Sequence, residues 1–281
     1  MSIRTELLSL VEHVNAQIRL PSVRRVYIPA PNIAIDKAAE FGLVELEDGA
    51  AGLFYAWLGA SQDGISERYQ TDALVGAQAI DIARYYGGDD DIARSLGLAA
   101  INAISQSVFA RLEIETDDAQ DSMGGLSLAR GDHLGMVGNF PSLVRQARAL
   151  GVPVTVVERK PHMIKRERGV QITLEPEAIR NCNKIICTAA TLINDSVDRM
   201  LGYCTSAETV VMIGPSASFF PDPLFARGVA AVGGTRVLDP SAAIAAQQMG
   251  KGLGSSTQRY ILSGANYAGT TRLCNTLSET S

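Results

Sequence analysis

Residues 133–161 read HLGMVGNFPSLVRQARALGVPVTVVERKP, and this stretch decides the fold class. An apolar run ends at Gly138, a helical pattern follows Pro141, and a second apolar run ends at Glu158, 20 residues after Gly138. This order predicts a strand, a turn, a helix and a second strand. In a doubly wound sheet, the helix N-terminus after the first strand and the carboxylate after the second lie along the edge where ligands bind. The stretch therefore predicts a small-molecule site.

The alternation of apolar runs with helical stretches continues toward the C-terminus. Short runs that are apolar throughout and rich in β-branched residues are typical of a parallel sheet covered on both faces. The predicted strands are 134–137, 154–157, 185–187, 210–213 and 229–232, and the helical stretches lie near 142–150, 176–181, 194–201, 224–227 and 241–249. We therefore predict a Rossmann-like domain over residues 133–252.

The first 115 residues follow a different pattern, in which strands come before helices. A helix over about 1–20 stops before Pro21, three short extended runs predict an antiparallel meander, and helical stretches cover 77–86 and 92–112. This order is typical of an α+β domain. The predicted fold class is thus α/β, with a Rossmann-like parallel sheet domain preceded by a smaller α+β domain and a cleft between two separate cores.

Two remaining segments lack clear periodicity. Residues 116–132 are acidic and contain glycine, so we predict an interdomain linker. Residues 253–281 are polar and rich in glycine, serine and threonine, so we predict a flexible tail or flap.

Composition narrows the class of partner. The 281 residues are 46% hydrophobic and carry a net charge of -5, which gives little support to nucleic-acid binding. No apolar run approaches the ~20 residues that a bilayer requires, and the N-terminal helix carries acidic residues unlike a secretory signal. The four cysteines show no CxxC spacing and are expected to be reduced. We expect a cytoplasmic protein with a small-molecule ligand and no nucleic-acid or membrane partner.

The candidate ligand contacts follow the predicted strands. Backbone N–H groups of Gly138, Asn139 and Phe140 would face an anion at the start of a helix, although this turn lacks the full GxGxxG pattern. Glu158 would accept hydrogen bonds from hydroxyl groups, as the acidic residue after the second strand does for a ribose. The alternative for Glu158 is a solvated acid paired with a neighbouring cation.

Two further turns complete this set. The hydroxyls and the carboxamide of the third turn would hold a polar ligand edge or cap a helix, and the fourth turn would present N–H groups, a hydroxyl and an aromatic wall. Buried rings are the alternative for the aromatics. The residues are Thr188, Thr191 and Asn194 in the third turn, and Gly214, Pro215, Ser216 and Phe220 in the fourth.

No metal or nucleophile motif is visible, since the three histidines are dispersed and neither HExxH nor GxSxG occurs. Cys187 fits a small core residue at a strand end. A convergence of His162, Glu158 and Cys187 in space is a minor hypothesis.

At these motifs the chain resembles a family of uncharacterised proteins described as putative heavy-metal chelation proteins. The matching stretches are SLGLAAINA (95–103), MVGNF (136–140), VVERKP (156–161), TAATLIN (188–194) and IGPSA followed by Phe220-Pro221. The resemblance implies an N-terminal domain like the capping domain of enolase, a Rossmann-like domain, and an active site between them. It nominates Asn102, facing the predicted turns, as a catalytic residue, and Glu158 is the second catalytic candidate. From the sequence alone, Asn102 is a carboxamide in an Ala/Ile helix, which needs a partner or a ligand.

Three functions remain open at this point. The leading one is a small-molecule-binding protein, favoured to be an enzyme, that acts on a polar metabolite or metal-chelating compound in the interdomain cleft, as in metallophore handling or biosynthesis. A divalent metal ion enters only through the resemblance. The second is an enzyme with an adenosine-type cofactor, S-adenosylmethionine or NAD, at Glu158. The third is a non-catalytic homodimeric scaffold or sensor.

Overall fold

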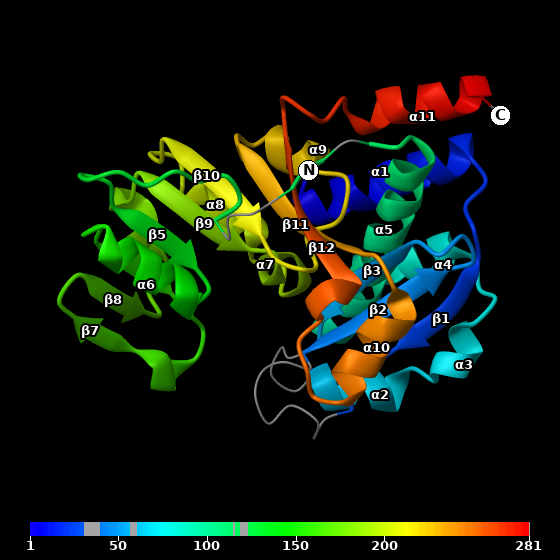
Figure 1. The fold of residues 1–281 in the computed structure, drawn as a ribbon, viewed down its shortest axis with the longest axis horizontal. Helices are drawn as coiled ribbons and strands as arrows, with labels where there is room; N and C mark the ends of the chain where they lie inside the picture. Colours follow the sequence, from blue (N-terminus) through cyan, green and yellow to red (C-terminus); the bar gives the residue numbers. More distant parts are fainter. Residues whose placement is uncertain (31–39, 57–60, 115, 119–122, 281) are drawn as a thin grey trace.

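The computed structural model describes residues 1–281 except 31–39, 57–60, 115, 119–122 and 281 (Figure 1). Its larger sheet has nine strands in the order β4-β12-β11-β10-β9-β5-β6-β8-β7. The other sheet is small and antiparallel, in the order β1-β2-β3.

Six neighbouring strands of the large sheet run parallel. They are β5 (Leu134–Val137), β6 (Val154–Val157), β8 (Val170–Thr173), β9 (Lys184–Thr188), β10 (Thr209–Ile213) and β11 (Ala231–Val237). Numbered along the chain, they stand in the order 3-2-1-4-5-6 across the sheet, which is the order of a doubly wound fold. The predicted α/β class with a mostly parallel sheet is therefore confirmed.

The elements between the parallel strands are short. They are the helical elements α6 (Pro141–Ala149), η2 (Pro161–Met163), η3 (Pro176–Asn181), α7 (Ala190–Ile193), α8 (Val197–Gly202) and α9 (Asp222–Phe225). Helix α10 (Pro240–Gln248) follows the last parallel strand, β11. The stretch predicted as a helix near 176–181 is a 3-10 helix. Within the described residues, no helix is long and apolar enough to cross a bilayer.

Three antiparallel strands extend the sheet at its ends. They are β7 (Lys165–Glu167) beside β8, and β12 (Thr257–Ser263) and β4 (Asp117–Asp118) beyond β11. The segment expected to link two domains thus contributes strand β4.

The expectation of a flexible C-terminal tail is wrong for the described residues. β12 pairs with β11 over seven residues, and helix α11 (Thr270–Thr280) follows the 3-10 turn η4 (Gly254–Ser256) and this strand. Tyr260 and Leu262 of β12 are buried, whereas the other residues of the strand are partly or fully exposed. The sequence of β12 is therefore polar overall although one face of the strand packs in the core. Leu273 and Leu277 bury the corresponding face of α11.

The smaller N-terminal unit contains β1 (Val23–Tyr27), β2 (Phe41–Leu46) and β3 (Ala51–Tyr55). Its helices are α1 (Ile3–Gln17), α2 (Ser61–Arg68), α3 (Thr71–Leu74), α4 (Ala79–Ala83), the 3-10 turn η1 (Arg84–Gly87) and α5 (Asp91–Arg111). This confirms the predicted small α+β unit that precedes the parallel sheet.

Helix α5 joins the two units. Every residue from Arg94 to Phe109 is buried, as expected for a helix with protein on all sides. Gly52 of β3 makes the close packing possible, because a Cβ there would lie 2.1 Å from the carbonyl oxygen of Ala99. One hydrophobic cluster runs from α1 and α5 into β9, β10, β12 and α11, so the two units share a core, contrary to the expectation of two separate cores.

Candidate functional site

The four predicted turns lie along one edge of the large sheet. Strands β6, β5, β9 and β10 are consecutive neighbours and parallel, so their carboxyl ends share this edge. The register places Val137 beside both Val157 and Cys187, and Ile213 beside Thr188. We call this edge the rim; it comprises residues 138–140, 158, 188–194 and 214–216.

Gly138 lies where the strand order reverses, between β5 and β9. Its φ is +89°, and a Cβ on it would be 2.9 Å from Cγ2 of Thr188. Both the backbone conformation and the close contact therefore require glycine. In doubly wound sheets, ligands bind at this reversal point, outside the carboxyl ends of the strands.

Glu158 is half-buried beside Gly138 and holds the turn after β5. Its Oε2 accepts a hydrogen bond from the backbone N–H of Asn139 at 3.3 Å, and its Oε1 accepts one from the N–H of Arg159 at 2.7 Å. A carboxylate has about four lone-pair positions, so each oxygen can accept another hydrogen bond. Glu158 can therefore fix the turn and still receive hydroxyl groups.

The start of α6 limits which anion fits this turn. Pro141 occupies the first turn, and no side chain caps the N-terminus. Gly138 stands at the first glycine position of a G-x-G-x-x-G motif, but Phe140 and Leu143 stand at the second and third. The second glycine normally lets a pyrophosphate approach the backbone, and the third permits close helix packing. This turn thus disfavours a dinucleotide pyrophosphate.

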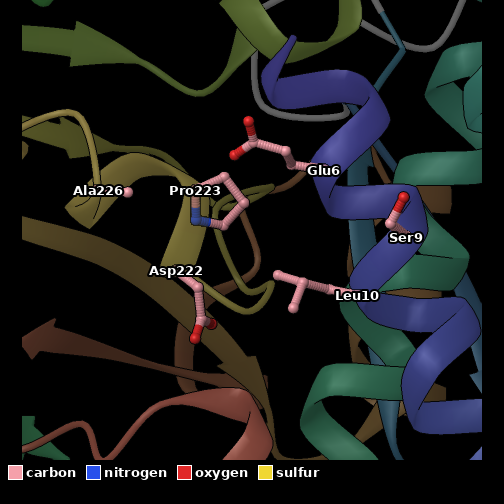
Figure 2. A pocket seen from close by; sticks show the side chains of 6 residues that line it. All are labelled: Glu6, Ser9, Leu10, Asp222, Pro223 and Ala226. Carbon is pink, nitrogen blue, oxygen red and sulfur yellow. The ribbon is translucent and has the colours of Figure 1, made fainter. Parts of the chain in front are cut away.

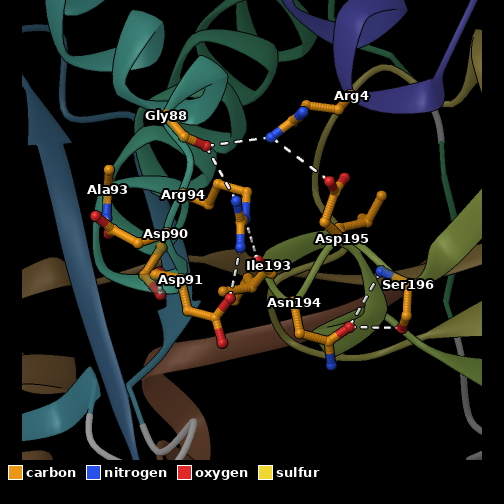
Figure 3. Close-up of polar contacts among 12 residues, drawn as sticks. Arg4, Gly88, Asp90, Asp91, Ala93, Arg94, Ile193, Asn194, Asp195 and Ser196 are labelled. Carbon is orange, nitrogen blue, oxygen red and sulfur yellow. Dashed lines mark hydrogen bonds and ion pairs between the residues drawn. The ribbon is translucent and has the colours of Figure 1, made fainter.

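The turn after β9 has mostly internal hydrogen bonds. Oγ1 of Thr188 accepts from the N–H of Ala190 at 3.3 Å, and Oγ1 of Thr191 donates to the carbonyl of Thr188 at 2.7 Å. Thr191 is 2% exposed, so it stabilises the turn and does not face a ligand. Oδ1 of Asn194 accepts from the N–H and the hydroxyl of Ser196, which leaves its Nδ2 without a protein partner among the described residues (Figure 3).

Arg94 of α5 anchors this turn from the N-terminal unit (Figure 3). Its Nε donates to the carbonyl of Ile193 at 2.5 Å, and its other nitrogens bind the carbonyl of Gly88 and the carboxylate of Asp91. The guanidinium is nearly buried and meets the C-terminal end of α7, where a positive charge is favourable.

Asn102 fixes the turn after β10. Its Nδ2 donates to the carbonyls of Leu53 and Ser216, both at 2.9 Å, and its Oδ1 accepts from the N–H of Ser218 at 3.2 Å. The residue is fully buried, and both donor hydrogens are in use. These contacts favour a structural role, in which Asn102 positions the rim, over the expected catalytic role.

The aromatic residue of the fourth turn belongs to the core. Phe220 is fully buried, and its ring packs edge-on against Phe109 with centroids 5.5 Å apart. It does not form the expected wall of a cleft. Ser216 is 2% exposed, and Gly214 lies against Ala189, so this turn offers mainly the partly exposed Pro215 to the rim.

Tyr55, at the end of β3, is a rim neighbour that the sequence did not reveal. Burial raises the pKa of its phenol, and the carboxylates of Glu40 and Glu158 raise it further. The phenol therefore remains a hydrogen-bond donor at neutral pH, and Glu158 lies within electrostatic reach of it. The sequence of this apolar strand does not indicate that its terminal tyrosine lies near Glu158.

The described residues do not fit a resident metal ion. They contain no group of three or more His, Cys, Asp or Glu side chains that could hold one. Burial raises the pKa of the Cys187 thiol to about 11, whereas His162 is exposed, so the hypothesised site with Glu158 does not form. A neutral buried thiol is a poor metal ligand.

Two hollows lie away from the rim. One, of about 360 Å³, lies between α1 and α9 (Figure 2) and is lined by Glu6, Ser9, Leu10, Asp222, Pro223 and Ala226. The other, of about 250 Å³, is lined by Arg24, Arg25, Glu45 and Ser241. Their carboxylates already have partners: Arg227 for Glu6, Thr270 for Asp222, and Arg25 for Glu45. The N–H groups of Gly138 and Asn139, which were expected to face an anion, instead donate to the carbonyl of Val157 and to Glu158. We place the candidate site at the rim because Glu158 and Asn194 retain hydrogen-bonding capacity there.

Comparison with known proteins agrees with this architecture. Residues 121–262 match the family model DUF364, described as "Putative heavy-metal chelation", and residues 38–105 match a second model, DUF4213, with the same description. The chain therefore belongs to the DUF364 family.

Its relatives add the fold but no activity. An uncharacterised protein of Methanocaldococcus jannaschii is 27% identical over 158 residues, which are 55% of this chain and 59% of that protein. Structures of DUF364 proteins of unknown function from Pyrococcus horikoshii and Desulfitobacterium hafniense match with TM-scores of 0.66 and 0.64. At 20% and 19% identity, they cover 92% and 91% of this chain and 99% and 98% of their own.

Proposed function

We propose that the protein binds a small polar molecule with hydroxyl groups at the rim, beneath the end of β3. The supporting observation is that the loops after β6, β5, β9 and β10 share one edge, where Glu158 retains acceptor capacity. Tyr55, whose phenol lies within electrostatic reach of Glu158, would supply a donor. Together these groups suit a ligand that both donates and accepts hydrogen bonds.

The family description makes a metal-chelating compound the preferred ligand class. Because the described residues hold no metal cluster, the compound itself would supply the metal's ligands and the protein would bind the compound. Chelators of this kind carry hydroxyl, amine or carboxylate groups, which the donor and acceptor groups of the rim can recognise. Catalysis remains a further proposal, for which Glu158 and Tyr55 are the titratable candidates.

An adenosine-type cofactor is the second candidate, favoured by one observation. The order 3-2-1-4-5-6 places Glu158 after the second parallel strand, where an acidic residue binds a ribose. Phe140 and Leu143 at the glycine positions favour S-adenosylmethionine over NAD, because only NAD brings a pyrophosphate to this turn.

Saturation-transfer NMR with defined probes tests both candidates. The probes are citrate, Zn²⁺–citrate, S-adenosylmethionine and NAD, each added to the full chain. We expect transfer to citrate or to the diamagnetic Zn²⁺–citrate, and loss of most of it in Glu158→Gln. Glu208→Gln is the matched control, because Glu208 is exposed and precedes β10, at the opposite edge of the sheet.

The outcomes separate the candidates. Transfer to S-adenosylmethionine alone would favour the cofactor, and equal signals in the Glu158 and Glu208 variants would contradict a site at the rim. We expect a homodimer in solution, checked by light scattering. A non-catalytic scaffold would be favoured by three results together. These are no saturation transfer to any probe, a dimeric mass in solution, and unchanged function in cells that carry the Glu158→Gln variant.

A further inference from the structure

The hairpin at one end of the large sheet is strongly basic. Residues 159–174 carry five Lys and Arg and a single acidic residue, although the whole chain has a net charge of -5. Residues 164–169 are all exposed. Within the part of the chain that the structure describes, Arg159, Lys160, Arg166 and Arg168 make no ion pair; Lys165 pairs with Glu167. We call residues 159–174 the basic hairpin.

The basic hairpin also has an open backbone edge. β7 ends the strand order and pairs only with β8 among the described strands, with Arg166 opposite Gln171. Figure 1 places β7 and β8 at the far end of the molecule from α5 and α11. Ile164 and Leu174 flank the two strands and are 57% and 37% exposed. An edge of this kind can accept another strand through its free main-chain groups.

Charge and an open strand edge together select the class of partner. A nucleic acid or an anionic membrane would use the charges and leave the edge strand unused. Single-stranded nucleic acids also favour aromatic stacking platforms, and residues 159–174 contain no aromatic side chain other than His162. An extended peptide uses both features, because arginine binds carboxylates in two-point geometry and the backbone pairs as a strand.

We propose that the basic hairpin is a docking site for an extended acidic segment of another protein, which adds as a strand beside β7. Its carboxylates would pair with Arg166, Arg168 and Lys160, and apolar side chains between them would cover Ile164 or Leu174. The partner would then lie next to Glu158, which directly precedes this segment, at one end of the rim.

Fluorescence anisotropy with a labelled peptide of alternating Glu and Val, 12 residues long, tests this proposal. The hairpin variant Arg166→Glu with Arg168→Glu should weaken binding at least about tenfold relative to the wild type. Arg19→Glu with Arg130→Glu is the control, because both residues are exposed, make no ion pair among the described residues and give the same change in net charge. Circular dichroism checks that both variants fold.

A second peptide separates strand addition from charge alone. A peptide of alternating Glu and Pro has the same charge, but proline fixes φ at about −65° and holds the chain in a polyproline II conformation that does not match a β-strand ladder, so it should bind at least about tenfold more weakly. Equal binding of the two peptides, equal affinity for the two double variants, or no binding of the Glu-Val peptide would overturn the proposal. The proposal would also be overturned if the protein bound oligo-dT or phosphatidylserine vesicles but did not bind the Glu-Val peptide.

Discussion

Replacing Asn102 with alanine tests whether its carboxamide holds the two units together at the rim. The substitution removes three hydrogen bonds and leaves the carbonyls of Leu53 and Ser216 and the N–H of Ser218 without this partner. An unsatisfied buried polar group costs about 1–3 kcal/mol. Because water can enter the vacated space, we expect the free energy of unfolding to fall by about 3–5 kcal/mol, below the simple sum.

Urea denaturation followed by circular dichroism measures this loss. Ser105→Ala is the matched control, since Ser105 is also fully buried on α5 but donates only to the carbonyl of Ile101 in its own helix. We expect the control to lose less than about 1 kcal/mol. For a chain of this size, the Asn102 variant should melt roughly 5–9 °C below the wild type. Losses within about 1 kcal/mol of each other would refute the role of Asn102 in holding the two units together.

Three further perturbations address the turn after β5, the docking of α1 and the thiols. Gly138→Ala should cost about 1–2 kcal/mol more in unfolding free energy than Gly151→Ala. Both glycines have positive φ, but only at Gly138 would the added Cβ meet another residue within 4 Å. Equal costs would contradict this close contact. Arg227→Ala should lose about 1–2 kcal/mol at pH 7, because Arg227 makes two hydrogen bonds with Glu6. Those hydrogen bonds lower the pKa of Glu6 from 4.5. The difference in unfolding free energy between the wild type and Arg227→Ala should therefore shrink as the pH falls below that value. Urea denaturation at several pH values measures it, and a difference that stays constant with pH would oppose this. Cys187, whose pKa is raised to about 11, should resist Ellman's reagent at pH 8 until urea unfolds the protein, and rapid modification of the native thiol would count against its burial.

The parallel sheet was predictable because its strands are buried on both faces. β5 and β6 have the bounds predicted from their apolar runs, and Pro141 begins α6 as expected. β7, β8 and β12 lie near the sheet ends and have polar or exposed faces, so their composition resembles that of loops. The patterns of β7 and β8, over three and four residues, are too short to identify a strand, and in the seven residues of β12 only Tyr260 and Leu262 are buried.

The candidate site was predictable in position and less so in chemistry. The carboxyl ends of parallel strands must meet at one edge, so Gly138, Glu158 and Thr188 could be grouped from the sequence. Whether Asn102 or Phe220 faces a ligand depends on tertiary neighbours: the backbone carbonyls around Asn102 and the ring of Phe109. For the same reason, the sequence could not place Tyr55 near Glu158, because these residues belong to different units and are brought together only by the shared core.

Crystals of the full chain soaked with citrate or Ni²⁺–citrate test the proposed rim most directly. A ligand bound at the rim should give density over Gly138 and Glu158, with a hydroxyl or carboxylate group within hydrogen-bonding distance of Tyr55. Density confined to the hollow between α1 and α9, or to the one beside Arg24 and Arg25, would contradict it.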